Sequence, residues 1–132
     1  MIPLVVSGAF HSPLMASAAR GLHENLTATW FSDARCAIIA NVSAAPVERA
    51  DDVRTALDQQ LLGAVRWEDS MRTLLDAQPQ GFVEIGAGKV LRGLLRTVSK
   101  DAPSWNVEDP ESLQATLAAL GTVPAAEGSA RA

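Results

Sequence analysis

The chain has 132 residues, of which 48% are hydrophobic, and 15 acidic against 11 basic residues give a formal net charge of −4. This length fits one domain or part of a larger one, and the acidic balance disfavours a general binder of nucleic acid or anionic membranes. A single cysteine, Cys36, excludes an internal disulfide and favours a reducing compartment, so we expect a cytoplasmic protein. No apolar run approaches the roughly 20 residues of a membrane span, and the first residues lack the basic flank of a signal peptide.

The N-terminal region predicts a strand followed by a helix. Residues 4–7 have strand character, and the sequence Ser12-Pro13 is a typical start for a helix over residues 12–28. His11 therefore lies at a strand-to-helix junction, where reacting groups gather in α/β sheets. A neutral imidazole there can act as a general base near pH 7; the alternative is a histidine that only ties down the backbone. The second histidine, His23, is expected on the surface of the helix.

The middle of the chain predicts a buried strand and two helices. Residues 36–42 form a continuous apolar run without alternation, which is typical of a parallel strand covered on both faces. Cys36 is accordingly expected in the core. Residues 43–49, with Pro46, are predicted as a loop. Apolar residues at helical spacing then predict helices over 51–62 and 67–77, separated by Gly63.

The C-terminal third begins with a second apolar strand over residues 82–85, a Gly86–Gly88 turn and a helix reaching about Lys100. A strand, a glycine turn and a helix are also found in phosphate-binding loops, but here Lys89 is followed by valine where that motif needs Ser or Thr. The glycines are better explained by a tight turn. Basic residues recur every four positions on one face of this helix, which is either solvated or binds an anionic partner: Arg92, Arg96 and Lys100.

Residues 105–107 are predicted as a short edge strand, and Asp109-Pro110 as the start of a last helix that ends at Gly121. Residues 122–132 are small and polar and are predicted to be a disordered tail. Alternating strands and helices indicate an α/β fold, with a mostly parallel sheet layered with helices. Residues 1–121 would supply too few strands to cover the apolar ones, so they are interpreted as part of a larger fold.

Four segments carry a resemblance to a known family. The segment Ser7–Met15, SGAFHSPLM, resembles the surroundings of the active-site histidine of malonyl-CoA:acyl carrier protein transacylases and of the acyltransferase domains of fatty-acid and polyketide synthases. Residues 42–44 resemble the family's "VSNVTA" strand end, and residues 60–67 its "RQL…PVRW" segment, with Ala64 in place of proline. Residues 82–91 resemble "FVEIGPGKVL", with Ala87 in place of proline. The match covers residues 2–121 and only the C-terminal portion of the family, which has an α/β-hydrolase-like fold.

The resemblance implies transfer of a malonyl group from malonyl-CoA to the phosphopantetheine thiol of an acyl carrier protein through a serine ester. His11 matches the family's histidine base, and Gln60 matches the glutamine whose main-chain carbonyl holds that imidazole. Gln59 is the alternative if the register slips by one residue. Phe10 matches the aromatic residue that narrows the pocket, which favours malonyl over methylmalonyl groups. Neither a metal nor a cofactor is implied beyond the two substrates.

The nucleophile is the missing part. In the family it is the serine of a G-x-S-x-G turn, and no serine of this sequence has that context. The first hypothesis is an acyltransferase portion that supplies the histidine but not the serine and is inactive alone. It needs an N-terminal half that is either supplied by a separate chain or lost by truncation. The second is a non-catalytic remnant or interaction module that binds a carrier or another partner. Both leave apolar faces open, which predicts self-association.

Overall fold

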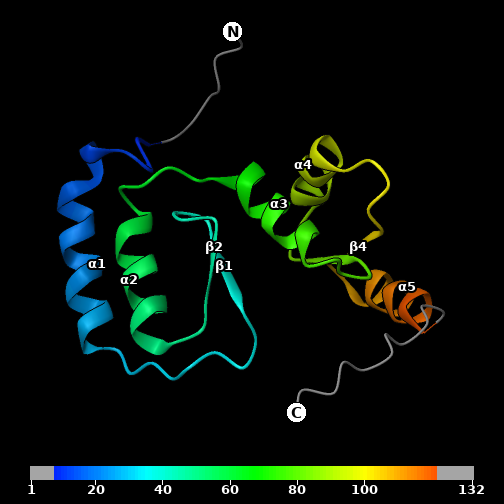
Figure 1. Cartoon of the computed structure of the whole chain (residues 1–132), viewed down its shortest axis with the longest axis horizontal. Helices are drawn as coiled ribbons and strands as arrows, with labels where there is room; N and C mark the ends of the chain where they lie inside the picture. The colour runs from blue at the N-terminus through cyan, green and yellow to red at the C-terminus, as the bar shows by residue number, and fades with distance from the viewer. Residues whose placement is uncertain (1–7, 122–132) are drawn as a thin grey trace, which may run out of the picture. The chain divides into compact units, whose positions relative to one another are not determined.

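The computed structural model describes residues 8–121 and divides into two compact units, Met1–Leu74 and Leu75–Ala132, each of which is described by itself (Figure 1). The predicted strand over residues 4–7 and the predicted tail over 122–132 lie outside the described residues. No helix of residues 8–121 combines the length and the hydropathy needed to cross a bilayer.

The first unit begins with a 3-10 turn, η1 (Pro13–Met15), that leads into α1 (Ala16–Ala28). The predicted helix start is confirmed, with Pro13 in the first turn and Ser12 extended at φ −142°. The Ser12 hydroxyl donates to the carbonyl of Ala9 at 2.7 Å instead of accepting from the helix. Helix α1 lies beside α2 (Ala50–Gln60), and a contact between the His23 ring and the Asp58 carboxylate joins the two (Figure 1).

The strand expected over residues 36–42 is shorter and differently paired. It covers only Ile38–Ala40 (β1) and pairs antiparallel with β2 (Ala45–Val47), a strand that the sequence analysis treated as loop. Pro46 pairs with Ile39 in this ladder. The expectation of a parallel strand buried on both faces is therefore wrong for the described residues. Cys36 is exposed, so its expected place in the core is wrong as well.

Helix α3 (Trp67–Asp76) follows α2 after a short connecting segment, and the division between the units falls in its last turn. The second unit contains β3 (Phe82–Ile85), α4 (Val90–Val98), β4 (Ser104–Val107) and α5 (Pro110–Leu120). β3 and β4 are parallel, with Phe82 opposite Ser104 and Ile85 opposite Val107. These bounds confirm the predicted β3, the edge strand β4 and the helix start at Pro110.

Helix α5 has the strongest cap in the described chain. The Asp109 carboxylate accepts from the Ser112 N–H at 2.7 Å, and the Ser112 hydroxyl accepts from the Asp109 N–H at 3.0 Å, which forms a capping box. The Ser112 N–H and then the Ser112 hydroxyl stabilise the charged carboxylate, so they hold the pKa of Asp109 below its usual value.

The hydrophobic core is small. Among residues 8–121, only three hydrophobic side chains are buried: Ala44, Met71 and Leu95. Several large apolar side chains are strongly exposed, including Leu14 at 81% and Trp30 at 84% in the first unit and Ile85 at 81% in the second. β3, expected to be buried on both faces, alternates between half-buried and exposed residues. The apolar pattern therefore marks faces that the described residues themselves do not cover.

Candidate functional site

The His11 backbone is anchored to the segment that leaves α2. Its N–H donates to the carbonyl of Leu61 at 3.1 Å, across fifty positions of sequence. Its φ is 61°, in the left-handed region that few residues other than glycine adopt. The junction between Gly8 and η1 thus turns sharply at the histidine and is fixed there by a carbonyl from a distant segment.

The His11 ring makes a second contact with the same segment. Its Nδ1 lies 3.0 Å from the main-chain carbonyl oxygen of Gln60. Because a carbonyl only accepts, Nδ1 must carry the proton in this contact, and in the neutral ring Nε2 is left with its lone pair. His11 is exposed, so Nε2 is open to a reacting group. This is the arrangement that a general base requires.

Gln60, rather than Gln59, is the residue whose carbonyl holds the imidazole. The Gln59 carbonyl instead accepts from the N–H of Gly63 at 2.9 Å. The side-chain amide of Gln60 points along the chain, with Nε2 3.4 Å from the carbonyls of Gly63 and Ala64. In this structure the contact is therefore made by Gln60, and the Leu61 carbonyl is a second contact that sequence reasoning missed.

Phe10 precedes the histidine and is 57% exposed. Its ring covers Gly8, since a Cβ built on that glycine would lie 3.0 Å from the ring. The role of Phe10 in selecting malonyl groups stays a prediction.

The second histidine forms a different kind of contact. His23 Nδ1 lies 3.2 Å from both carboxylate oxygens of Asp58, and the two side chains are 64% and 37% exposed. This solvated pair links α1 to α2, which confirms the expected surface position of His23. A solvated pair of this type contributes little to stability.

The glycine turn of the second unit is filled by the protein's own carboxylates. Glu84 accepts from the N–H groups of Leu91 and Arg92 at 3.0 and 2.9 Å, and so occupies the N-terminus of α4. Glu108 accepts from the Gly88 N–H at 2.9 Å. A phosphate would need these same N–H donors. The contacts therefore give a structural reason, beyond the missing Ser or Thr, why this turn is not a phosphate loop.

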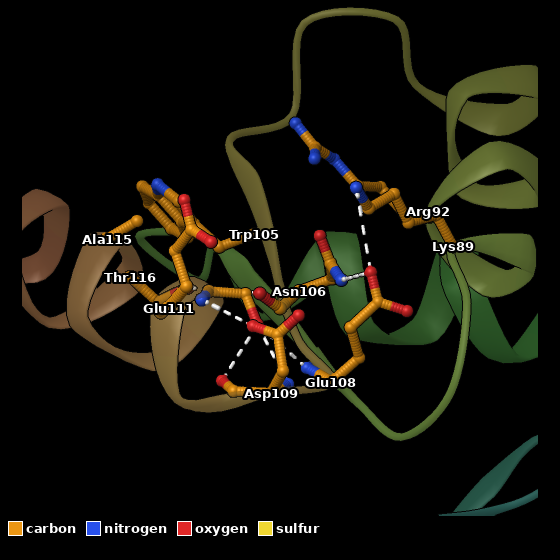
Figure 2. Close-up of a pocket in the computed structure, with 10 residues that line it drawn as sticks. Lys89, Arg92, Trp105, Asn106, Glu108, Asp109, Glu111, Ala115 and Thr116 are labelled. Atoms are coloured by element: carbon orange, nitrogen blue, oxygen red, sulfur yellow. Dashed lines mark hydrogen bonds and ion pairs between the residues drawn. The ribbon is translucent and has the colours of Figure 1, made fainter.

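A cavity of about 420 Å³ opens beside this turn, at the carboxyl ends of β3 and β4 (Figure 2). One of its carboxylates has two partners: Lys89 Nζ lies 3.7 Å from Glu108, and the amide of Asn106 lies 3.5 Å from the same carboxylate. Half-buried Arg92 donates to the Ser104 hydroxyl at 3.2 Å. Of the predicted basic face, Arg92 is therefore engaged within the unit, whereas Arg96 and Lys100 are exposed.

Comparisons with known proteins show the fold and name the proteins that this chain resembles. No family model matches the chain. The solved acyl-carrier-protein S-malonyltransferase of Bartonella henselae superposes with a TM-score of 0.83 at 35% identity, over 90% of this chain and 38% of that one. The Streptococcus pneumoniae structure gives 0.83 at 37% identity, over 89% and 38%. The predicted α/β acyltransferase fold is confirmed.

The sequence relatives have matching names. A malonyl CoA-acyl carrier protein transacylase of Bacillus subtilis is 41% identical over 119 residues, and one of Synechocystis is 37% identical over 112 residues. The chain spans 38% of the length of each. These relatives are matched over their C-terminal part, so the chain is similar to the C-terminal portion of proteins named malonyl CoA-acyl carrier protein transacylase. One structural neighbour, 30% identical with a TM-score of 0.82, is a malonyl-transacylase in complex with a type II polyketide acyl-carrier protein.

Proposed function

We propose that this chain supplies the general base for transfer of a malonyl group from malonyl-CoA to the phosphopantetheine thiol of an acyl carrier protein. The observation that carries the proposal is the 3.0 Å contact between His11 Nδ1 and the Gln60 carbonyl, which leaves Nε2 as the free acceptor. Nε2 would take the proton of a serine hydroxyl as the serine attacks the malonyl thioester. It would then give that proton to the departing coenzyme A thiolate.

The second half of the reaction uses the same atom. Nε2 would accept the proton of the carrier's thiol as this thiol attacks the malonyl-serine ester, and would return it to the serine oxygen. The Gln60 carbonyl accepts the Nδ1 proton in a hydrogen bond throughout the cycle. This hydrogen bond keeps Nδ1 protonated and stabilises the imidazolium that forms transiently. A carboxylate partner for the histidine is not needed, because a fixed carbonyl defines the same tautomer.

The serine has to come from elsewhere. The 132 residues contain no G-x-S-x-G sequence. We therefore propose that His11 acts on a serine carried by the remaining, N-terminal part of the family fold, and that these 132 residues alone are inactive. The partners would be malonyl-CoA, an acyl carrier protein and that N-terminal acyltransferase half. Phe10 would line the acyl pocket beside the histidine and favour malonyl over branched groups.

A non-catalytic interaction module is the alternative. The observation in its favour is the apolar surface that both units expose, with Trp30, Leu14 and Ile85 more than four-fifths accessible. An exposed apolar face can bind a partner protein, or it can be covered by the remaining part of the same fold. The alternative predicts association with a carrier or a partner without chemistry at His11.

Malonyl loading separates the two. The chain is incubated with radiolabelled malonyl-CoA, with and without a separately expressed N-terminal half of the Bacillus subtilis relative, and label on denatured protein is counted. We expect label on the half that holds the serine, only in the mixture, and its loss in a His11→Asn variant. His23→Asn is the matched control and should retain labelling. Absence of label in mixtures whose two halves are shown to associate would favour the interaction module.

A further inference from the structure

The turn between β1 and β2 holds the start of α3 through Asn41. The main-chain carbonyl of Asn41 accepts from the Arg66 N–H at 2.9 Å, and its side-chain oxygen lies 3.0 Å from the Ser70 hydroxyl. Ser70 is only 2% exposed and also lies 2.8 Å from the Arg66 carbonyl. Asn41 therefore contacts two successive turns of chain at the beginning of the helix.

Two further contacts tie the same turn to α3. The Arg66 guanidinium donates to the Ser43 carbonyl at 2.9 Å, and the Thr73 hydroxyl donates to the Ala44 carbonyl at 2.8 Å. Ala44 is buried and has a φ of 57°, so the turn adopts a conformation that few alanines adopt. The turn and the first half of α3 thus form one hydrogen-bonded block.

This block determines where the segment between α2 and α3 lies. The segment runs from Leu61 to Arg66, beginning at the end of α2 and ending at the Asn41 contact. In its middle, Gly63 packs so closely on Val42 that an added Cβ would lie 2.7 Å from a methyl group of that valine. The two carbonyls that hold His11 belong to Gln60, the last residue of α2, and to Leu61, the first residue of this segment.

We propose that Asn41 and Ser70 are positioning residues for His11. They fix the far end of the connecting segment, so the junction between α2 and this segment presents the Gln60 carbonyl to Nδ1 in one place. The catalytic meaning of this inference rests on the proposed function, but the contact itself is a property of the chain alone. A buried hydroxyl or amide oxygen that loses its partner raises the free energy of the folded chain, so a backbone arrangement that restores a hydrogen bond becomes favourable by comparison.

The experiment measures the ratio of the Nδ1-protonated to the Nε2-protonated tautomer of neutral His11, by proton–nitrogen correlation spectra of the labelled chain. Ser70→Ala should lower this ratio about fivefold or more, the change that corresponds to the loss of about 1 kcal/mol of hydrogen bonding. Asn41→Asp keeps an oxygen acceptor for Ser70 and should retain the ratio of the unsubstituted chain. Thr116→Ala is the matched control, because Thr116 is 4% exposed and its hydroxyl bonds a main-chain carbonyl in the other unit.

His23 gives an internal check on folding, because its signals report on the contact between α1 and α2. If Ser70→Ala loses that signature, Arg66→Met decides. It removes the guanidinium contact with the Ser43 carbonyl and the solvated ion pair with Asp69, from a side chain that is 48% exposed, and should lower the ratio in the same direction. An unchanged ratio in folded Ser70→Ala, or in Arg66→Met where that variant decides, overturns the proposal. A shifted ratio with no malonyl loading by the unsubstituted mixture refutes the proposed function and leaves the positioning intact.

Discussion

Gly63 lies in the segment between α2 and α3, where the structure leaves no room for a side chain. A Cβ there would lie 2.7 Å from Val42 Cγ2 and 3.0 Å from the Gln59 carbonyl oxygen, whereas ordinary contacts begin at 3.4 Å. Overpacking of this kind costs about 1–3 kcal/mol, and the lower entropy of the unfolded alanine chain returns about 0.4–1 kcal/mol. We therefore expect Gly63→Ala to reduce the free energy of unfolding by about 1–2 kcal/mol.

Val42→Ala removes the methyl group that the new Cβ would meet. The double variant should therefore be less destabilised than the sum of the two single variants, by about 1 kcal/mol, since the two sites are in contact. The remaining 3.0 Å approach to the Gln59 carbonyl keeps the recovery incomplete. This coupling energy separates a steric cause from a general weakness of the segment.

Urea unfolding followed by the combined fluorescence of Trp30 and Trp67 is the assay, in a Trp105→Phe background that leaves tryptophans only in the first unit. Gly21→Ala is the matched control: nothing lies within 4 Å of its Cβ, and it sits inside α1. It should leave the unit as stable or up to about 1 kcal/mol more stable. Equal effects of the two substitutions, or full additivity with Val42→Ala, would refute the steric reasoning.

Three further expectations follow from the second unit and from the exposed surface. Since Ser112 lowers the pKa of Asp109, the cap of α5 stabilises the fold above the ordinary aspartate pKa and loses this contribution as pH falls through the lowered value. Asp109→Asn should flatten that acid limb in circular dichroism, and an identical limb would contradict the linkage. Glu84→Gln has one acceptor oxygen instead of two, so amide hydrogen exchange at Leu91 or Arg92 should accelerate about fivefold; unchanged exchange would contradict the contact. The exposed apolar side chains predict a mass that rises with concentration in sedimentation velocity, and a constant monomer mass would count against this.

The helices and the second sheet were largely predictable, because their signals are local. Asp109 and Pro110 mark a helix start by chemistry that acts within one turn, and the structure begins α5 at Pro110. β3 covers residues 82–85 as predicted, since the glycine turn that ends it is visible in the sequence. The start of α4 has no capping residue next to it in the sequence, because the carboxylate that accepts from its first N–H groups belongs to Glu84 on the preceding strand.

The errors have a common physical origin. An apolar run such as residues 36–42 shows that a segment has to be covered, but it does not show which atoms cover it. In the described residues β1 is three residues long, and its partner β2 contains Pro46, which argued for a loop. Cys36, just before this strand, is exposed, because none of the described residues covers this end of the apolar run.

Only part of the candidate site could be predicted from the sequence. The junction position of His11 follows from the local sequence, but its contact with Gln60 spans 49 positions and came from the family resemblance. No spacing rule predicts that the Leu61 carbonyl also holds the His11 N–H, or that Asn41 meets Ser70. Contacts of this kind depend on tertiary packing, which is the information that local patterns lack.

The left-handed backbone at His11 decides how a knock-out of this residue should be made. At φ 61°, alanine pays a steric cost that asparagine and glycine largely avoid. A His11→Ala variant therefore removes the imidazole and also disturbs the junction, whose N–H is bonded to Leu61. His11→Asn removes the imidazole from a backbone that it tolerates, so its loss of activity reports on proton transfer. The difference between the two variants measures how much the bent junction itself contributes.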